Sequence, residues 1–217
     1  MKQPKKHDDE EIEMPQTPQM PPTNRRFAFF MSDVCSESVR PLCEWIFANN
    51  FDASEDAPKE LTIVINSKGG SLHDAFALVD IMMGSRIPIR TIGLGQIASA
   101  GLLIFMSGTR GMRSLTPNTS ILSHQWAWGA MGKQHELVAA TREWDLTQRR
   151  IMKHYKKCTG LPEIKIKKLL MAPADQWLDA DEALKLGLCD RIQDMSQYIP
   201  NNKPKSVKKA KKSPKKR

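Results

Sequence analysis

The chain has 217 residues, 40% of them hydrophobic, which is enough for one domain with a proper core. Its net charge of +9 comes from residues 203–217, which hold nine Lys/Arg and no acid; the rest carries 24 basic and 24 acidic residues. This distribution excludes a uniformly basic, nucleic-acid-binding body. The cysteines Cys35, Cys43, Cys158 and Cys189 are scattered without metal-like spacing, so we expect neither a metal site nor a disulfide framework.

The two ends of the chain differ in composition from the middle. Residues 1–24 are Pro-rich and acidic and residues 201–217 are Lys-rich, patterns that predict disorder. The N-terminus lacks the apolar region of a secretory signal, and no apolar run approaches the roughly 18–20 residues that a membrane span needs. We therefore expect one domain at 25–200 in a cytoplasmic protein, with no membrane association and only weak polyanion or nucleic-acid contact by the tail.

The segment from residue 26 to residue 95 alternates between strand and helix patterns. The predicted elements are a strand at 26–31, a helix at 36–49, a buried strand at 61–66, a helix from the capping residue Ser71 to Met83, and a buried strand at 89–95. In the helix at 36–49, Val39, Leu42, Cys43, Ile46 and Phe47 recur at helical spacing. We expect this face, Phe47 included, to pack inward.

The second half continues the alternation with longer helices. The predicted elements are a helix at 98–108, short strands at 111–115 and 120–124, a long charged helix at 133–158 that ends at Gly160, and helices at 162–171 and 179–187. Strands that alternate with helices predict an α/β fold with a largely parallel sheet.

A serine stands among unusually small residues in GQIASAG, residues 95–101, between a predicted strand and a predicted helix. A tight strand-to-helix turn can expose a nucleophilic hydroxyl beside free backbone N–H groups. Serine in a Gly/Ala-rich turn is also a common helix cap. The local pattern by itself leaves both readings of Ser99 open.

Four blocks together resemble one family. They are INSKGGS (65–71), GQIASAG (95–101), TPNTSILSHQ (116–125) and LDADEALKLGLCDRI (178–192). In this order and spacing they are similar to the proteolytic subunit of the Clp protease, a serine peptidase of the ClpP family. The similarity extends from Phe27 to Ile192 and implies a ClpP/crotonase-like fold of repeated ββα units, with a handle strand and a long helix.

The resemblance implies a catalytic triad. Ser99 matches the family's nucleophile, and His124 matches the general base, which takes the hydroxyl proton and returns it to the leaving amine. Asp175 matches the acid that orients the base. Asp179 and Asp181 are rivals close in sequence, but both look like caps of the following helix, so Asp175 is preferred.

For the oxyanion hole, the resemblance points to the backbone N–H groups of Gly70 and Ala100. Glycine suits a donor that must approach the substrate closely, and the N–H after the nucleophile is the usual second donor. Such a peptidase needs no cofactor and no metal ion.

The resemblance also implies partners. Family members stack two seven-membered rings around a chamber, and a hexameric AAA+ unfoldase delivers unfolded protein substrates. Ring-to-ring contact uses the handle segment, which here is residues 125–150. Trp126 and Trp128 depart from the family pattern in it, and core packing and a ring interface are equally open for them. Thr62 and Val64 stand where the family has aromatic docking residues, which leaves the unfoldase undetermined.

Other function classes remain as alternatives. The chain could be a catalytically silent structural subunit of mixed rings, or a ClpP-like protease that processes one assembly such as a viral capsid. A crotonase-type acyl-CoA enzyme can share the general fold, but the ordered triad motifs argue against it. A nucleic-acid-binding module rests only on the Lys-rich tail.

Overall fold

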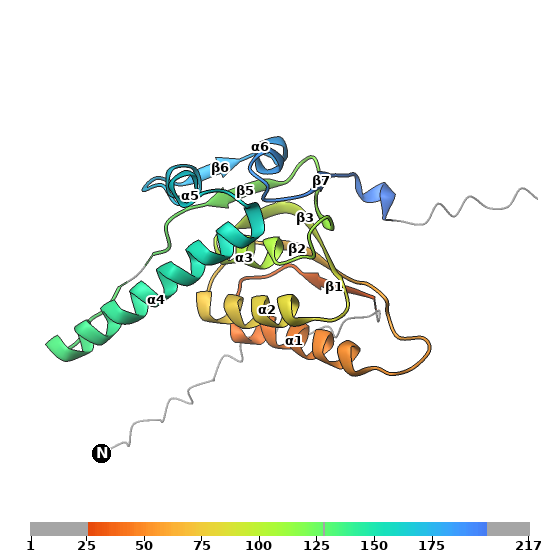
Figure 1. The fold of residues 1–217 in the computed structure, drawn as a ribbon, viewed down its shortest axis with the longest axis horizontal. Coiled ribbons are helices and arrows are strands. Elements are labelled where there is room, and N and C mark those ends of the chain that lie inside the picture. Colours follow the sequence, from red (N-terminus) through yellow and green to blue (C-terminus); the bar gives the residue numbers. More distant parts are fainter. Residues whose placement is uncertain (1–25, 128, 199–217) are drawn as a thin grey trace, which may run out of the picture.

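The computed structural model describes residues 26–127 and 129–198. The arms predicted at 1–24 and 201–217 lie outside these ranges, as does Trp128. Figure 1 shows the arrangement of the elements. In chain order they are β1 (Phe27–Phe30), α1 (Ser36–Phe51), β2 (Leu61–Ser67), α2 (Leu72–Gly84), β3 (Ile89–Ala98), α3 (Ala100–Met106), β4 (Arg113–Leu115), β5 (Ser120–Ser123), α4 (Gln134–Thr159), α5 (Glu163–Leu169), β6 (Gln176–Leu178), α6 (Ala180–Lys185), β7 (Arg191–Ile192) and the 3-10 turn η1 (Met195–Gln197).

The strands form one mostly parallel sheet, as predicted. Its main path is β1-β2-β3-β4-β7, and all of these neighbours are parallel. β5 is parallel to β3, and β6 is antiparallel to β5. The fold is therefore α/β, with α1 and α2 together below the sheet in the view of Figure 1.

β3 is longer than predicted, and it bends. Gly95 has a φ of 66°, which glycine adopts without strain. Before the bend, Thr91–Gly93 pair with β4; after it, Gln96–Ala98 pair with β5. One strand thus precedes each of α1, α2 and α3, so the repeat in this part of the chain is βα and not the expected ββα.

The inward face of α1 differs from the prediction at one residue. Val39, Leu42 and Ile46 are buried, but Phe47 is 59% exposed and packs against Phe51, with ring centroids 4.7 Å apart. The prediction for Phe47 is wrong because each helical residue advances about 100° around the axis, and one step beyond Ile46 leaves the buried stripe. Trp45 on the other flank is buried instead.

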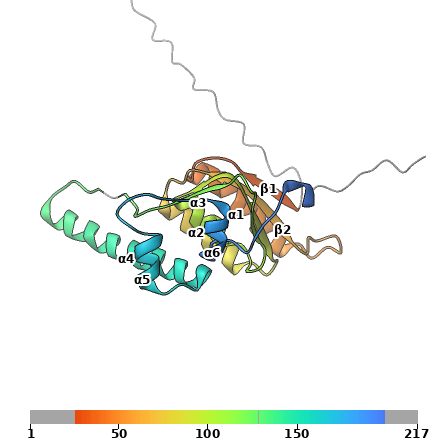
Figure 2. The ribbon, with the colours of Figure 1, turned by 90° about the horizontal axis from the view of Figure 1, so that it is seen from above.

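α4 projects from the body (Figures 1 and 2). Only its second half packs inward; its buried residues are Thr147, Ile151, Met152, His154, Tyr155 and Cys158. Gly160, with a φ of 75°, ends the helix as predicted. Within the described residues, no helix is long and apolar enough to cross a membrane.

The strand predicted in the handle segment is absent from the part that the structure describes. Residues 125–127 and 129–133 form no strand. A strand exists only where its N–H and C=O groups meet those of a neighbouring strand. No neighbouring strand faces this segment within the described chain, so the prediction is wrong for the single chain.

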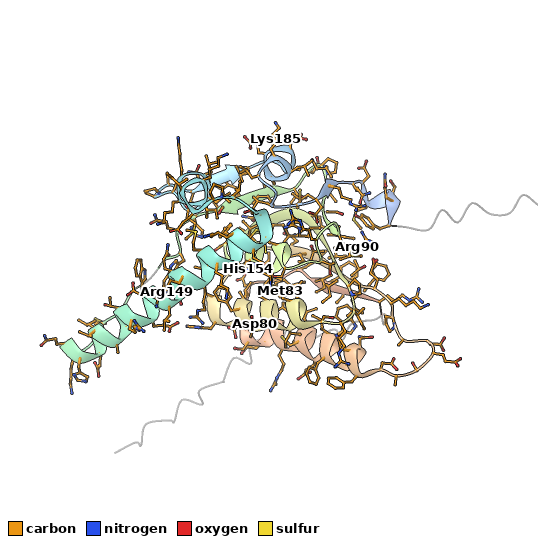
Figure 3. All side chains as sticks on the ribbon, viewed as in Figure 1. Asp80, Met83, Arg90, Arg149, His154 and Lys185 are labelled. Atoms are coloured by element: carbon orange, nitrogen blue, oxygen red, sulfur yellow. The ribbon has the colours of Figure 1, made fainter. Side chains whose placement is uncertain are left out.

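His154 is buried where α4 passes over the other helices (Figure 3). Its Nε2 lies 2.9 Å from the carbonyl oxygen of Leu103 in α3, and its ring meets the edge of Phe76 in α2. Burial, the largest effect, lowers the pKa of His154 from 6.5 to about 4, although the hydrogen bond to Leu103 opposes this. At neutral pH the ring is uncharged, so its Nε2–H donates to Leu103.

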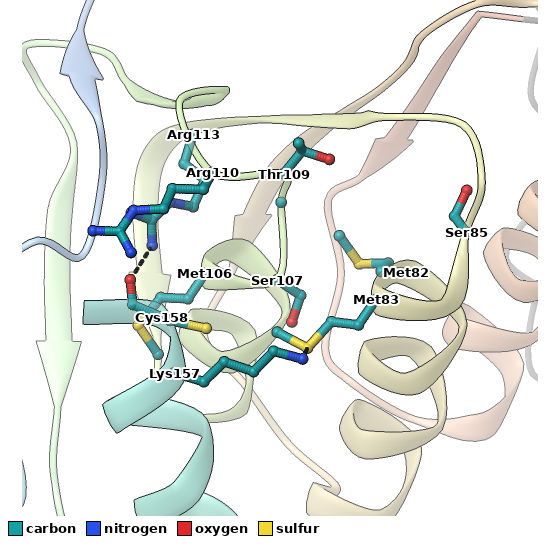
Figure 4. A pocket seen from close by; sticks show the side chains of 11 residues that line it. Met82, Met83, Ser85, Met106, Ser107, Thr109, Arg110, Arg113, Lys157 and Cys158 are labelled. Carbon is teal, nitrogen blue, oxygen red and sulfur yellow. Dashed lines mark hydrogen bonds between the residues drawn. The ribbon is translucent and has the colours of Figure 1, made fainter. Parts of the chain in front are cut away.

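A buried ion pair fastens the C-terminal part to the sheet. The guanidinium of Arg113 in β4 binds Asp190 through two hydrogen bonds of 2.6 and 2.9 Å. Their side chains are only 4% and 15% exposed. A third bond, of 3.0 Å, joins Arg113 to the carbonyl oxygen of Cys158 near the end of α4 (Figure 4). Burial opposes the charge of Asp190, but hydrogen bonds from Arg113 and Gly111 hold its pKa below the usual 3.8.

The hollow beside this pair has a volume of about 220 Å³ (Figure 4). It lies between the C-terminal ends of α2, α3 and α4, and its lining includes Met82, Met106, Lys157 and Cys158. Arg113 is also one of its lining residues.

We predict that Asp190→Asn destabilises the fold by about 3 kcal/mol, because it leaves the buried Arg113 cation without its counter-charge. Chemical denaturation followed by circular dichroism measures this loss. Asp194→Asn, at an exposed position four residues further along, is the matched control and should change stability by less than about 0.5 kcal/mol. Equal stability of the two variants would contradict the structural role of the pair.

His154 predicts a loss of stability in mild acid. The unfolded chain takes up a proton near pH 6.5, but the folded chain does so only near pH 4. The difference in pKa therefore makes its full contribution to the free energy of unfolding above pH 6.5. This contribution is lost as the pH falls toward 4, by about 2 kcal/mol between pH 7.5 and pH 5. Chemical denaturation at pH 7.5 and at pH 5 should show that the free energy of unfolding falls less in His154→Gln than in the unmodified chain. The exposed His135→Gln should behave like the unmodified chain.

Candidate active site

The register between β5 and β6 brings His124 and Asp175 together. The antiparallel pairs run from Ile121↔Leu178 to Ser123↔Gln176. One further step in the same register sets His124 opposite Asp175, just beyond the ladder. The distance between His124 Nδ1 and Asp175 Oδ1 is 3.4 Å.

Ser99 occupies the tight turn between β3 and α3. Its φ of 53° and ψ of −125° make it the one non-glycine residue with positive φ in the described ranges. Such a conformation costs about 1–3 kcal/mol and persists only where the surroundings enforce it. Here its N–H donates to the carbonyl oxygen of Leu122 in β5 at 3.0 Å, which holds the turn beside that strand.

Ser99, His124 and Asp175 form one line. Ser99 Oγ lies 2.8 Å from His124 Nε2, within ordinary hydrogen-bond distance. If the hydroxyl donates to Nε2, the imidazole proton sits on Nδ1 and faces Asp175. The 3.4 Å Nδ1–Oδ1 distance is longer than a normal hydrogen bond, and the two side chains are 27% and 58% exposed. This geometry is that of a hydroxyl with a base and an orienting carboxylate.

The two alternative carboxylates, Asp179 and Asp181, lie at the start of α6 and not beside His124. Asp179 is the N-cap of α6 and accepts from the N–H of Glu182 at 2.8 Å, as predicted for a cap. Asp181 was also expected to be a cap, but this is wrong: it lies in the first turn of the same helix. The structure brings Asp175 to His124, and it assigns Asp179 to the helix end.

Two glycines of the loop after β2 are tightly packed, Gly69 against the turn of Ser99 and Gly70 against Val34. A Cβ atom on Gly69 would stand 2.7 Å from the Cβ of Ser99 and 3.0 Å from the backbone nitrogen of Ala100. A Cβ on Gly70 would stand 2.3 Å from the carbonyl oxygen of Val34. Both glycines have positive φ, of 99° and 146°. The loop can lie this close to Ser99 only because Gly69 carries no side chain, and this close to Val34 only because Gly70 carries none.

Val34 and Ser67 hold the glycine loop, and the sequence analysis assigned neither of them a role. Val34 N–H donates to Gly69 O, and Val34 O accepts from Ser71 N–H, both at 2.8 Å. Ser67 Oγ accepts from the N–H of Gly69 at 3.2 Å. The serine in INSKGGS was the only available signal for Ser67, and nothing in the sequence indicated Val34.

The loop leaves two backbone donors free. In the described ranges, neither the N–H of Gly70 nor that of Ala100 donates a hydrogen bond to another protein group. Gly70 turns its N–H away from Val34, because the bonds to Val34 come from the residues on either side. No group of three or more His, Cys, Asp and Glu side chains that could hold a metal ion exists among the same residues.

Comparison with known proteins decides the family. The family model for Clp protease matches residues 24–196. The chain belongs to the Clp protease family. Membership in this family implies a peptidase and agrees with the α/β fold and its mostly parallel sheet.

Several curated relatives in the Clp protease family match most of the chain. The chain is 31% identical over 169 residues to ATP-dependent Clp protease proteolytic subunit 1 of Mycobacterium bovis, and the same holds for that of Mycobacterium leprae. Each match covers 78% of this chain and 82% of the relative. Subunit 2 of Thermobifida fusca is 32% identical over 140 residues, which is 64% of this chain and 68% of the relative.

The two positions at which the resemblance led us to expect aromatic docking residues are internal in the single chain. Thr62 and Val64, both in β2, are buried and pair with Phe27 and Phe29 of β1. Phe29 itself is largely exposed. Of these two strands, β1 and not β2 therefore presents a largely exposed aromatic side chain, that of Phe29.

The close approach of Gly69 to Ser99 generates a stability prediction. Gly69→Ala should lower the free energy of unfolding by about 2–4 kcal/mol, because the new methyl group overlaps Ser99 and needs a strained φ. Gly84→Ala, at the helical end of α2 where a Cβ meets nothing within 4 Å, is the matched control and should be neutral or slightly stabilising. Thermal unfolding of both variants tests this, and equal melting temperatures would contradict the predicted crowding.

Proposed function

We propose that this chain is a serine endopeptidase, with Ser99 as nucleophile, His124 as general base and Asp175 as the acid that orients His124. The observation that carries the proposal is the 2.8 Å distance between Ser99 Oγ and His124 Nε2, with Asp175 on the far side of the ring. Membership in the Clp protease family supports peptide bonds as the substrate class.

The mechanism follows from this line of groups. Ser99 Oγ attacks the scissile carbonyl carbon while His124 Nε2 takes the hydroxyl proton. His124 then passes that proton to the leaving amine, and the acyl-enzyme ester remains on Ser99. A water molecule gives its proton to His124 and attacks the ester, and the proton returns to Ser99. Throughout, Asp175 stabilises the imidazolium and holds the proton on Nδ1.

The oxyanion of each tetrahedral intermediate needs fixed donors. The free N–H groups of Gly70 and Ala100 are our candidates. They belong to two turns that pack against each other, and Ala100 directly follows the nucleophile. Rigid backbone donors of this kind need no reorganisation when charge develops, and the loss of one typically costs about 10²–10³-fold in kcat.

We further propose that the chain works as the proteolytic subunit of a ring assembly, two stacked heptamers in the cytoplasm, which receives unfolded polypeptides from an AAA+ unfoldase. The three relatives reported above are all named proteolytic subunits of ATP-dependent Clp proteases. The projecting α4 supports self-association, because Leu137, Val138 and Trp144 on it are exposed apolar side chains. Burial of such a surface against further copies would stabilise an assembly.

The first test is hydrolysis of a short fluorogenic peptide after native mass spectrometry has sized the particle. Ser99→Ala should lower kcat/KM by at least about 10³-fold, because the nucleophile is lost while the fold is retained. Ser120→Ala, in β5 away from the line of three, is the matched control and should retain activity within about twofold.

Each outcome has a distinct reading. Ser99-dependent cleavage by a ring-sized particle supports both parts of the proposal. Cleavage that Ser99→Ala leaves intact would mean that another group or a contaminant is responsible, and it would overturn the catalytic assignment. A ring-sized particle without any cleavage would instead favour a silent structural subunit.

A further inference from the structure

A buried chain of hydrogen bonds runs directly behind His124. Ser123, the residue before it, is fully buried, and its Oγ lies 2.5 Å from the carbonyl oxygen of Leu170 and 2.7 Å from the hydroxyl of Tyr155. These three groups come from different parts of the fold: β5, the end of α5 and α4. The chain of bonds therefore ties the strand that carries His124 to two other elements.

The direction of each hydrogen bond follows from the number of protons. A serine hydroxyl has one proton, and a carbonyl oxygen can only accept. Ser123 must therefore donate to Leu170, and Tyr155 must donate to Ser123. Burial raises the pKa of Tyr155 to about 12, so its hydroxyl keeps this proton at any pH at which the protein would work.

Leu170 connects the chain to the acid side of the site. It lies five residues before Asp175, in the segment that leads into β6. Gln125, the residue after His124, reaches the same segment: its Nε2 donates to the carbonyl oxygen of Met171 at 3.1 Å. The residues on both sides of His124 are thus bonded to the segment that carries Asp175.

α4 also reaches both sides of His124. Tyr155 bonds Ser123, and seven residues earlier Gln148 Oε1 accepts from the indole N–H of Trp126 at 3.1 Å. Residues seven apart lie on one face of a helix. Trp126 also stacks on Trp144, with ring centroids 6.4 Å apart. One face of α4 therefore lies along the segment 123–126, with the base between its two contacts.

We propose that Tyr155 and Ser123 are positioning residues for the general base, and that their hydrogen bonds to each other and to Leu170 keep His124 in line with Ser99 and Asp175. This inference rests on the proposed function. Neither side chain touches the reacting atoms, so both act only through His124. Buried bonds suit this task, because Ser123 has no water to replace a lost partner.

The test compares Tyr155→Phe, Ser123→Ala and the double variant in peptide hydrolysis. Tyr155→Phe keeps the ring and removes one donor, so we expect kcat to fall about tenfold with KM within about twofold. The pH profile of kcat/KM is recorded for each variant, because a displaced base alters this profile whereas a purely structural change does not. If Tyr155 acts through Ser123, the double variant should be no slower than Ser123→Ala alone.

Tyr198→Phe is the matched control. Its hydroxyl donates to Gln193 at 2.7 Å, in a half-buried position near the end of the described chain. This variant should leave kcat and the pH profile unchanged. Particle size and melting temperature are measured for every variant, so that lost assembly is not mistaken for a displaced base. Should Tyr155→Phe fail to fold, Ser123→Ala, which removes the same bond from the other side, takes its place in the comparison.

The inference and the proposed function can fail separately. Ser99-dependent cleavage with an unchanged kcat and pH profile in Tyr155→Phe overturns the positioning role and leaves the peptidase standing. Additive losses in the double variant overturn it as well, because they mean that Tyr155 does not act through Ser123. If the unmodified protein shows no Ser99-dependent cleavage, the proposed function fails and the positioning role fails with it.

Discussion

Parallel hydrogen bonding along β3 holds the two halves of the protein together. β3 pairs with β2, which precedes it, and with β4 and β5, which follow it. It can pair with both β4 and β5 along the same edge only because it bends at Gly95, where φ is positive. A straight strand would keep one neighbour along that side. β5 would then not run beside Ser99, and His124 at its end would not reach the hydroxyl.

Close backbone contacts around Ser99 explain why the residues near it have such small side chains. The glycine loop and the turn of Ser99 approach until a single added methyl group at Gly69 would overlap the serine. Gly101, in the first turn of α3, lies against Ser67 in the same way. The strain at Ser99 is maintained by its bond to Leu122 and by this packing. Small residues here thus serve a close approach of two turns, while the N–H of Ala100 is free because this residue begins α3.

Local pattern predicted most of the elements, and its failures have physical causes. Buried apolar runs and helical spacing placed β2, β3, α2 and α4 nearly where they lie, because these signals depend on neighbours in sequence. Phe47 was assigned to the wrong face because helical spacing shows which side of a helix is buried but not how wide that buried side is. The handle strand was predicted from resemblance, yet a strand requires a partner, and no described part of this chain supplies one.

The sequence by itself determined the α/β class, the family resemblance and the candidates Ser99, His124 and Asp175. These depend only on the order of the motifs and the types of residue, both of which can be read directly from the sequence. The tertiary structure alone decided which groups meet. Cross-strand register set His124 opposite Asp175, and a one-residue slip of β6 would have sent that carboxylate to the other face. The same holds for Tyr155, Ser123 and Leu170: contacts among residues 32 to 47 positions apart depend on how helices and strands pack, which no local pattern records.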